Sequence, residues 1–113
     1  MTDTVVVAAS RAATVPVAAK VTVRASHARA GRMRLSGAVR PAVHGHAIAQ
    51  LAHHGRWTRV ARTRLATTPG SRRSRYRFSL PTQSVARPCH VVVFPRRGSG
   101  LVAGTSPRRI VGQ

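Results

Sequence analysis

The chain has 113 residues, of which 20 are basic and one is acidic, and its formal net charge is +19. A length of this order corresponds to one domain, and the single acidic side chain, that of Asp3, excludes functions that need paired carboxylates, such as glycosidase or aspartic-protease chemistry and carboxylate-bound calcium or magnesium sites. Apolar residues make up 42% of the chain, which is enough for a core and argues against a wholly disordered polycation.

Residues 1–19 are mostly Ala, Val and Thr without a clear period, which predicts a flexible leader with at most a stray strand near residues 4–8. The longest uninterrupted apolar run, residues 5–9, is far shorter than the roughly 20 residues of a membrane span, so we expect no transmembrane segment. The first residues are not basic and Arg11 interrupts the apolar stretch, which does not fit a secretory signal.

From residue 20 onward, apolar side chains alternate with polar ones, and Gly or Pro separates the alternating segments. Successive side chains of a strand point to opposite faces, so each segment has one apolar face and one arginine-rich face, as antiparallel strands beside a core do. Turns at these intervals predict an all-β domain over residues 20–113 with about seven strands. The expected strands are 21–26, 32–39, 46–52, 56–65, 75–80, 89–94 and 108–112.

The alternation also predicts which side chains form the core. Residues 89–94 are apolar on both faces, which favours a central strand, whereas residues 108–112 would form the closing edge strand. Gly55 would open a tight hairpin that carries Trp57 into the space between two sheets. The expected core residues are Val21, Val23, Met33, Leu35, Trp57, Val60, Tyr76, Phe78, Leu80, Val91 and Val93.

Five short motifs follow one another in a familiar order: Gly37-Ala38-Val39-Arg40-Pro41, Gly55-Arg56-Trp57, Tyr76-Arg77-Phe78, Val91-Val92-Val93 and Gly104-Thr105-Ser106. Together they resemble the immunoglobulin-like or fibronectin-III-like modules of secreted and surface proteins of actinobacteria, over residues 20–113. The resemblance implies an antiparallel β-sandwich of about seven strands and an extracellular or cell-envelope location. Because the chain shows no convincing signal peptide, a cytoplasmic location stays open. The chain departs from such modules in its basic surface and in lacking a Tyr just before residue 89.

The histidines and the cysteine do not predict a metal site or a catalytic nucleophile. His44, His46, His53 and His54 are close in sequence, and imidazole is a common zinc or copper ligand. A strand of about 20 Å would separate the two pairs, so we interpret them as turn histidines and predict neither a metal nor a cofactor. Cys89 and its neighbour in sequence, His90, would point to opposite faces of a strand, which favours a buried structural cysteine over a nucleophile.

Arginine-rich segments 56–64 and 72–77 are expected to pair as a hairpin whose outward side chains form a basic stripe. Surfaces that bind nucleic acid usually interleave exposed aromatic residues with such a stripe, but three of the four Phe, Trp and Tyr residues are expected in the core. Nonspecific attraction of nucleic acid in vitro is therefore expected. The candidate polyanion contacts are Arg56, Arg59, Arg62, Arg64, Arg72, Arg73, Arg75 and Arg77.

These patterns predict a non-enzymatic module that serves as a structural spacer or an adhesion-type interaction domain. Its binding surface would be the end loops near residues 40–46, 69–74 and 96–100, and its partner an anionic polymer or another protein. The alternative is a small arginine-rich nucleic-acid-binding protein that uses nonspecific phosphate contacts. A third interpretation attributes the arginine excess to coding bias or to a wrongly delimited reading frame.

Overall fold

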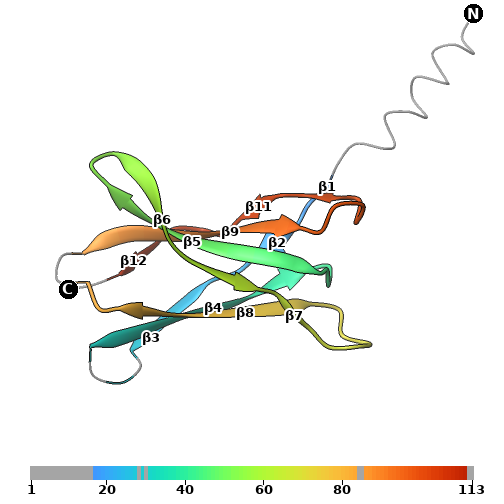
Figure 1. Cartoon of the computed structure of the whole chain (residues 1–113), viewed down its shortest axis with the longest axis horizontal. Coiled ribbons are helices and arrows are strands. Elements are labelled where there is room, and N and C mark those ends of the chain that lie inside the picture. Colours follow the sequence, from blue (N-terminus) through green and yellow to red (C-terminus); the bar gives the residue numbers. More distant parts are fainter. Residues whose placement is uncertain (1–16, 28, 30, 84–85, 112–113) are drawn as a thin grey trace, which may run out of the picture.

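The computed structural model describes residues 17–27, 29, 31–83 and 86–111, and within them the chain forms twelve strands and no helix (Figure 1). The strands are β1 (Val17–Ala18), β2 (Lys20–Val21), β3 (Arg24–His27), β4 (Arg32–Arg40), β5 (Gly45–His53), β6 (Arg56–Arg64), β7 (Ala66–Thr67), β8 (Ser74–Pro81), β9 (Arg87–Pro95), β10 (Leu101–Val102), β11 (Gly104–Thr105) and β12 (Arg109–Val111). Nothing helical in this part of the chain is long and apolar enough to cross a membrane.

Two antiparallel sheets contain most of these strands. The first sheet has the order β2-β4-β8-β7, with β3 also paired to β4, and the second has the order β11-β9-β5-β6, with β12 also paired to β9. The short strands β1 and β10 form a separate parallel pair. The all-β, antiparallel class predicted from the alternation is confirmed, and the apolar segment β9 lies inside the second sheet between β5 and the β11 and β12 strands.

The predicted count of about seven strands is not confirmed, because the described residues contain twelve. The segment expected at 21–26 is divided into β2 and β3, and β1, β7, β10 and β11 were not expected. The leader predicted over residues 1–19 lies outside the described residues up to residue 16, as does the stray strand near residues 4–8. Its last residues belong to the fold, because Val17 and Ala18 pair with β10 and Ala19 is buried.

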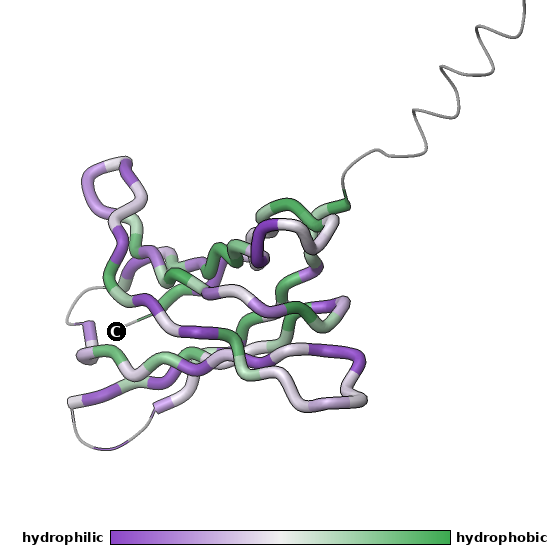
Figure 2. Tube along the Cα trace, turned by 45° about the vertical axis from the view of Figure 1, so that its right-hand side comes forward, coloured by the Kyte–Doolittle hydropathy of each residue, from purple (hydrophilic) through white to green (hydrophobic). Residues whose placement is uncertain are grey.

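Buried side chains of both sheets pack into one apolar cluster, with Leu35 and Phe78 from the first sheet and Ala49 and Val91 from the second. Hydropathy alternates along the long strands, as Figure 2 shows, because every second side chain faces this cluster. Nine of the eleven side chains expected in the core are buried: Val21, Val23, Met33, Leu35, Tyr76, Phe78, Leu80, Val91 and Val93.

Trp57 does not lie in the core, contrary to the prediction. His54 and Gly55 both have positive φ angles, 50° and 76°, and form a two-residue turn that places Trp57 opposite Ala52. The neighbouring Leu51 is buried, so Ala52 and Trp57 share the outer face of the sheet. The turn therefore carries the indole away from the apolar cluster.

Val60 is the second correction, since its side chain is 42% exposed. The pairing of β5 with β6 shifts register at this point: Ala49 lies opposite Ala61, while Gln50 lies opposite Arg59. Val60 is the extra residue of this β-bulge and has no partner in the ladder. Simple alternation fails here because a bulge changes which face the following side chains occupy.

Tyr76 ties β2 to the rest of the first sheet. Its hydroxyl donates a hydrogen bond to the carbonyl oxygen of Thr22, at 2.6 Å. A Cβ atom at Gly37, which lies opposite Tyr76 in the ladder, would collide with both the Thr22 carbonyl and the Tyr76 hydroxyl. The bond therefore requires glycine at position 37, although the backbone there has an ordinary negative φ.

Three loops meet at one end of the molecule, between β4 and β5, between β7 and β8, and between β9 and β10. The backbone N–H of Ala42 donates to the carbonyl oxygen of Arg72, and that of Arg96 donates to the carbonyl oxygen of His44. The buried hydroxyl of Ser74 both accepts from the N–H of Val43 and donates to its carbonyl oxygen. These bonds bring together the three end loops near residues 40–46, 69–74 and 96–100, for which the sequence predicts a binding surface.

Replacing Gly37 with Ala should destabilise the protein by about 1–3 kcal/mol, because β2 and β4 must move apart to accommodate the methyl group. Urea unfolding measures this loss. Ser36→Ala is the control, since Ser36 precedes Gly37 on the same strand but faces outward. Equal unfolding midpoints for the Gly37→Ala variant and the original protein would contradict the close approach described here.

Candidate polyanion-binding surfaces

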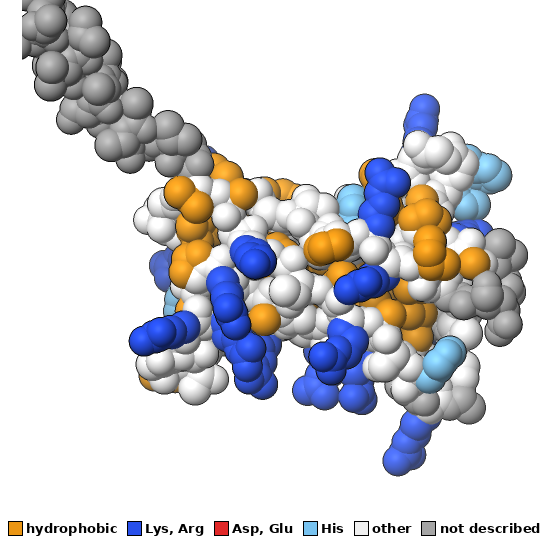
Figure 3. All heavy atoms as spheres, turned by 180° about the vertical axis from the view of Figure 1, so that it is seen from behind, with side chains coloured by type: hydrophobic (Ala, Val, Ile, Leu, Met, Phe, Trp, Pro, Cys, Tyr) orange, Lys and Arg blue, Asp and Glu red, His pale blue; other side chains and the backbone are white. Residues whose placement is uncertain are grey.

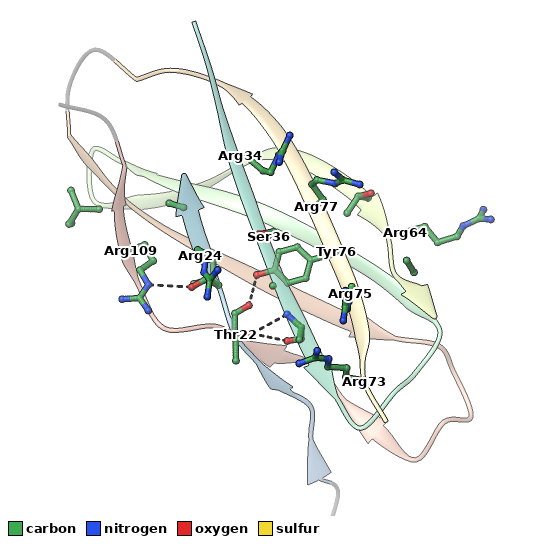
Figure 4. Close-up of a pocket in the computed structure, with 17 residues that line it drawn as sticks. Thr22, Arg24, Arg34, Ser36, Arg64, Arg73, Arg75, Tyr76, Arg77 and Arg109 are labelled. Carbon is green, nitrogen blue, oxygen red and sulfur yellow. Dashed lines mark hydrogen bonds between the residues drawn. The ribbon is translucent and has the colours of Figure 1, made fainter. Parts of the chain in front are cut away.

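The outer face of the first sheet carries a broad hollow rich in arginine (Figure 4). We name it the arginine hollow; its charged lining residues are Arg24, Arg34, Arg64, Arg73, Arg75, Arg77 and Arg109. They come from both sheets, since Arg64 ends β6 and Arg109 begins β12. The hollow is therefore a product of the tertiary fold and not of a single hairpin.

Strand register spaces the guanidinium groups in this hollow. Arg24 and Arg77 lie on either side of Ser36 in one row across the sheet, and Arg75 lies opposite Ala38 in the next. The residues between the arginines are thus small, which leaves each guanidinium accessible. Arg109 is anchored more firmly, because its Nε donates to the carbonyl oxygen of Val23 at 3.4 Å.

The outer face of the second sheet combines arginine with aromatic rings. The bulge at Val60 lets Arg59 and Arg62, three residues apart, point to the same side, and Trp57 and Arg64 share that side. A spacing of three within an otherwise alternating segment is the sequence signal that could have revealed the bulge. With a two-residue turn at His54-Gly55 it could also have placed Trp57 outside the core.

Trp57 lies against His90, with ring centroids 3.7 Å apart and an interplanar angle of 20°. The guanidinium carbon of Arg108 is 5.6 Å from the centroid of the indole, a cation–π distance. Nε2 of His90 is 2.6 Å from Oε1 of Gln50, and because an amide oxygen only accepts, His90 donates this bond. Burial first, and the positive charge of Arg108 second, lower the pKa of His90.

A second, smaller hollow lies where the end loops meet the outer face of the second sheet. We name it the loop hollow; it is lined by His44, His46, Arg62, Arg64, Arg96 and Arg97 together with Phe94. The rings of His46 and Phe94 are stacked, with centroids 5.6 Å apart and an angle of 22°. Partial burial, followed by the charge of Arg62, lowers the pKa of His46.

The predicted pairing of the two arginine-rich segments is wrong. Strand β6 pairs with β5, and β8 pairs with β4 and β7, so the segments lie in different sheets. Arg64, Arg73, Arg75 and Arg77 nevertheless border the arginine hollow. The remaining candidates do not line this hollow: Arg59 and Arg62 lie on the outer face of the second sheet, where Arg62 lines the loop hollow together with Arg64, Arg56 lies next to the β5–β6 turn, and Arg72 lies in the β7–β8 loop.

Cys89 is fully buried, and burial raises the pKa of its thiol to about 11. The His90 ring lies on the opposite face of β9, stacked on Trp57, and so cannot take a proton from the thiol. His44 and His46 lie at the first end of β5, whereas His53 and His54 lie at the other end. Neither arrangement resembles a nucleophilic centre or a shared metal site.

The positive charges have no acidic side chain beside them in the part of the chain described, because the only acidic residue, Asp3, lies outside it. Figure 3 shows Lys and Arg side chains spread over one face, without an acidic side chain among the residues that it colours. Arg64 borders both hollows, so the two basic surfaces adjoin. An anionic polymer can therefore follow guanidinium groups from one surface to the other.

Comparison with protein-family models, with curated proteins and with solved structures gave no match for this chain.

The only tryptophan of the chain, Trp57, is stacked on His90 and should therefore report the protonation of this histidine. A protonated imidazole quenches an adjacent indole, so we expect Trp57 fluorescence to fall as the pH is lowered, with a midpoint below the ordinary histidine value of 6.5. The folded state takes up this proton less readily than the unfolded state, so the free energy of unfolding also decreases as the pH falls below 6.5.

A fluorescence titration checks this expectation. His90→Gln should remove the transition, and His46→Gln, which changes an imidazole in the other stack, should leave it in place. A midpoint at or above 6.5 would show that neither burial nor Arg108 disfavours the charged imidazole.

Proposed function

We propose that the chain is a non-enzymatic interaction module with an immunoglobulin-like sandwich fold, which binds anionic polymers through its arginine-lined surface. The observation that carries the proposal is the arginine hollow, in which seven guanidinium groups from two sheets and the β7–β8 loop line one concavity. Such a surface attracts polyanions through charge and through charge-assisted hydrogen bonds. The resemblance to modules of secreted proteins favours an adhesion or spacer role outside the cell or in its envelope.

The strand order supports the sandwich. Taking β2 with β3 and β11 with β12 as interrupted strands, the first sheet follows the A-B-E-D order of an immunoglobulin domain. The second sheet then follows the order C′-C-F-G, with β5 as C and β9 as F. The apolar cluster shared by the two sheets is also what a sandwich core requires.

The chemistry of the chain supports a role in binding and not in catalysis. Its single acidic side chain cannot provide a pair of carboxylates as acid and base, and the Cys89 thiol is buried with a raised pKa. Arginine keeps its charge at all physiological pH values and so serves as a permanent anion contact.

The second candidate function is nucleic-acid binding, and a specific observation favours it. Trp57 and Phe94 lie outside the core, so only Tyr76 and Phe78 of the four Phe, Trp and Tyr residues are buried. The sequence predicted that three of these four residues would be buried, and that prediction counted against a nucleic-acid-binding function. Phe94 is exposed and Trp57 is half-buried, and aromatic rings that reach the surface beside arginine are the combination that single-stranded nucleic acid requires.

The salt dependence of binding tests the role of the arginine hollow. The double variant Arg34→Gln/Arg77→Gln should reduce the slope of log affinity against log salt for a DNA duplex by roughly 2, measured between about 50 and 200 mM salt. The matched control, Arg29→Gln/Arg56→Gln, removes the same charge outside both hollows. Equal changes for the two variants would mean that net charge alone, and not the hollow, attracts the polymer.

A further inference from the structure

Phe94 occupies a position that the core does not explain. Its neighbour Val93 is fully buried, so alternation places the Phe94 ring on the outer face of the second sheet, where 40% of the residue is exposed. The stacked imidazole of His46 supports the ring from one side. A large apolar ring held in place at the surface gains free energy when another flat ring covers it.

Cations flank this aromatic pair. Arg64 lies opposite His46, and His46 lies opposite Phe94, so a guanidinium, an imidazole and a phenyl ring form one row across three strands, about 10 Å in width. Arg62 is close enough to His46 to lower the pKa of the imidazole. Arg96 approaches from the loop side, where its N–H is bonded to His44.

We propose that the loop hollow binds single-stranded nucleic acid, with one base stacked on Phe94 and the neighbouring phosphates contacting Arg62, Arg64 and Arg96. The inference deepens the nucleic-acid candidate above and rests on the same attraction between guanidinium groups and an anionic chain. It adds a ligand class, because a single strand offers free base faces as well as phosphates. A duplex hides those faces within its own stack, and a sulfated polysaccharide has none.

The outer face of the second sheet carries a second pair of stacked rings, those of Trp57 and His90. His90 and Phe94 are four residues apart on β9, so the Trp57–His90 stack lies about 13 Å from Phe94 on the same side of the sheet. On β6, Arg59 lies level with His90, because both are opposite Gln50, and Arg62 lies between this level and that of Phe94. The face thus offers cations along a path that begins at the loop hollow and runs parallel to β9.

The test compares two probes of equal charge. Fluorescence anisotropy measures the binding of a labelled oligothymidylate of about 12 nucleotides, and of an abasic phosphodiester of the same length, at about 100 mM salt. Phe94→Ala should weaken binding of the oligothymidylate about 10-fold and leave the abasic probe unchanged, and Phe94→Tyr should restore the affinity. Arg62→Gln/Arg64→Gln should weaken binding of both probes, because each contacts phosphate.

Val60→Ala is the matched control. Val60 is 42% exposed on β6 and lines neither hollow, so this variant should bind both probes as the original protein does. Thermal unfolding shows whether each variant retains the fold.

Equal affinity of the original protein for the two probes, or equal loss of both with Phe94→Ala, would overturn the stacking site but leave polyanion binding intact. Preference for heparin over the oligothymidylate would assign the surface to a sulfated polysaccharide and overturn the inference. Failure of heparin, duplex and both oligonucleotides to bind would overturn the inference together with the proposed function.

Discussion

Hydration of the guanidinium groups is the constraint on which the rest of this structure depends. No acidic side chain accompanies the arginines in the described residues, and burial of an unpaired cation costs several kcal/mol. Each arginine must therefore reach water, and the face of a strand that carries arginine becomes the outer face. In β4 and β8 this requirement and the burial of Leu35 and Phe78 act in the same direction. The same separation of arginine from apolar side chains therefore produces both the apolar cluster and the charged surface.

The parts of the fold that could be predicted from the sequence are the strands in which buried apolar and exposed polar side chains alternate strictly. The regular pattern of β4 and β8 defined their buried faces, and the apolar run of β9 indicated its internal position. The position of β6 was predicted, but alternation could not assign its faces because the bulge at Val60 interrupts the period. Trp57 was assigned to the core because the turn at Gly55 was expected to direct it between the sheets, whereas the turn directs it outward. The pairing of 56–64 with 72–77 failed for a different reason, since partners of separate sheets are chosen by tertiary packing.

The two hollows differ in what they offer to a ligand. The arginine hollow presents charge with small side chains between the guanidinium groups, an arrangement suited to any flexible polyanion. The loop hollow adds the His46–Phe94 stack and hence a surface against which a flat ring can pack. The end loops could be expected from the sequence as a binding surface but the aromatic stack could not, because the exposure of Phe94 depends on which side of β9 faces the core. That choice is fixed by the register of β9 with β5.

The bulged, arginine-rich edge of the second sheet also affects whether two copies of the protein associate. An open edge strand exposes backbone donors and acceptors that can pair with a second copy, and proteins often protect such edges with bulges or positive charge. Strand β6 has both, in the register shift beside Val60 and in the arginines of its outer side. Two copies approaching edge to edge would crowd like charges together before any ladder forms. A polyanion that neutralised this edge would remove the barrier and would thereby promote self-association.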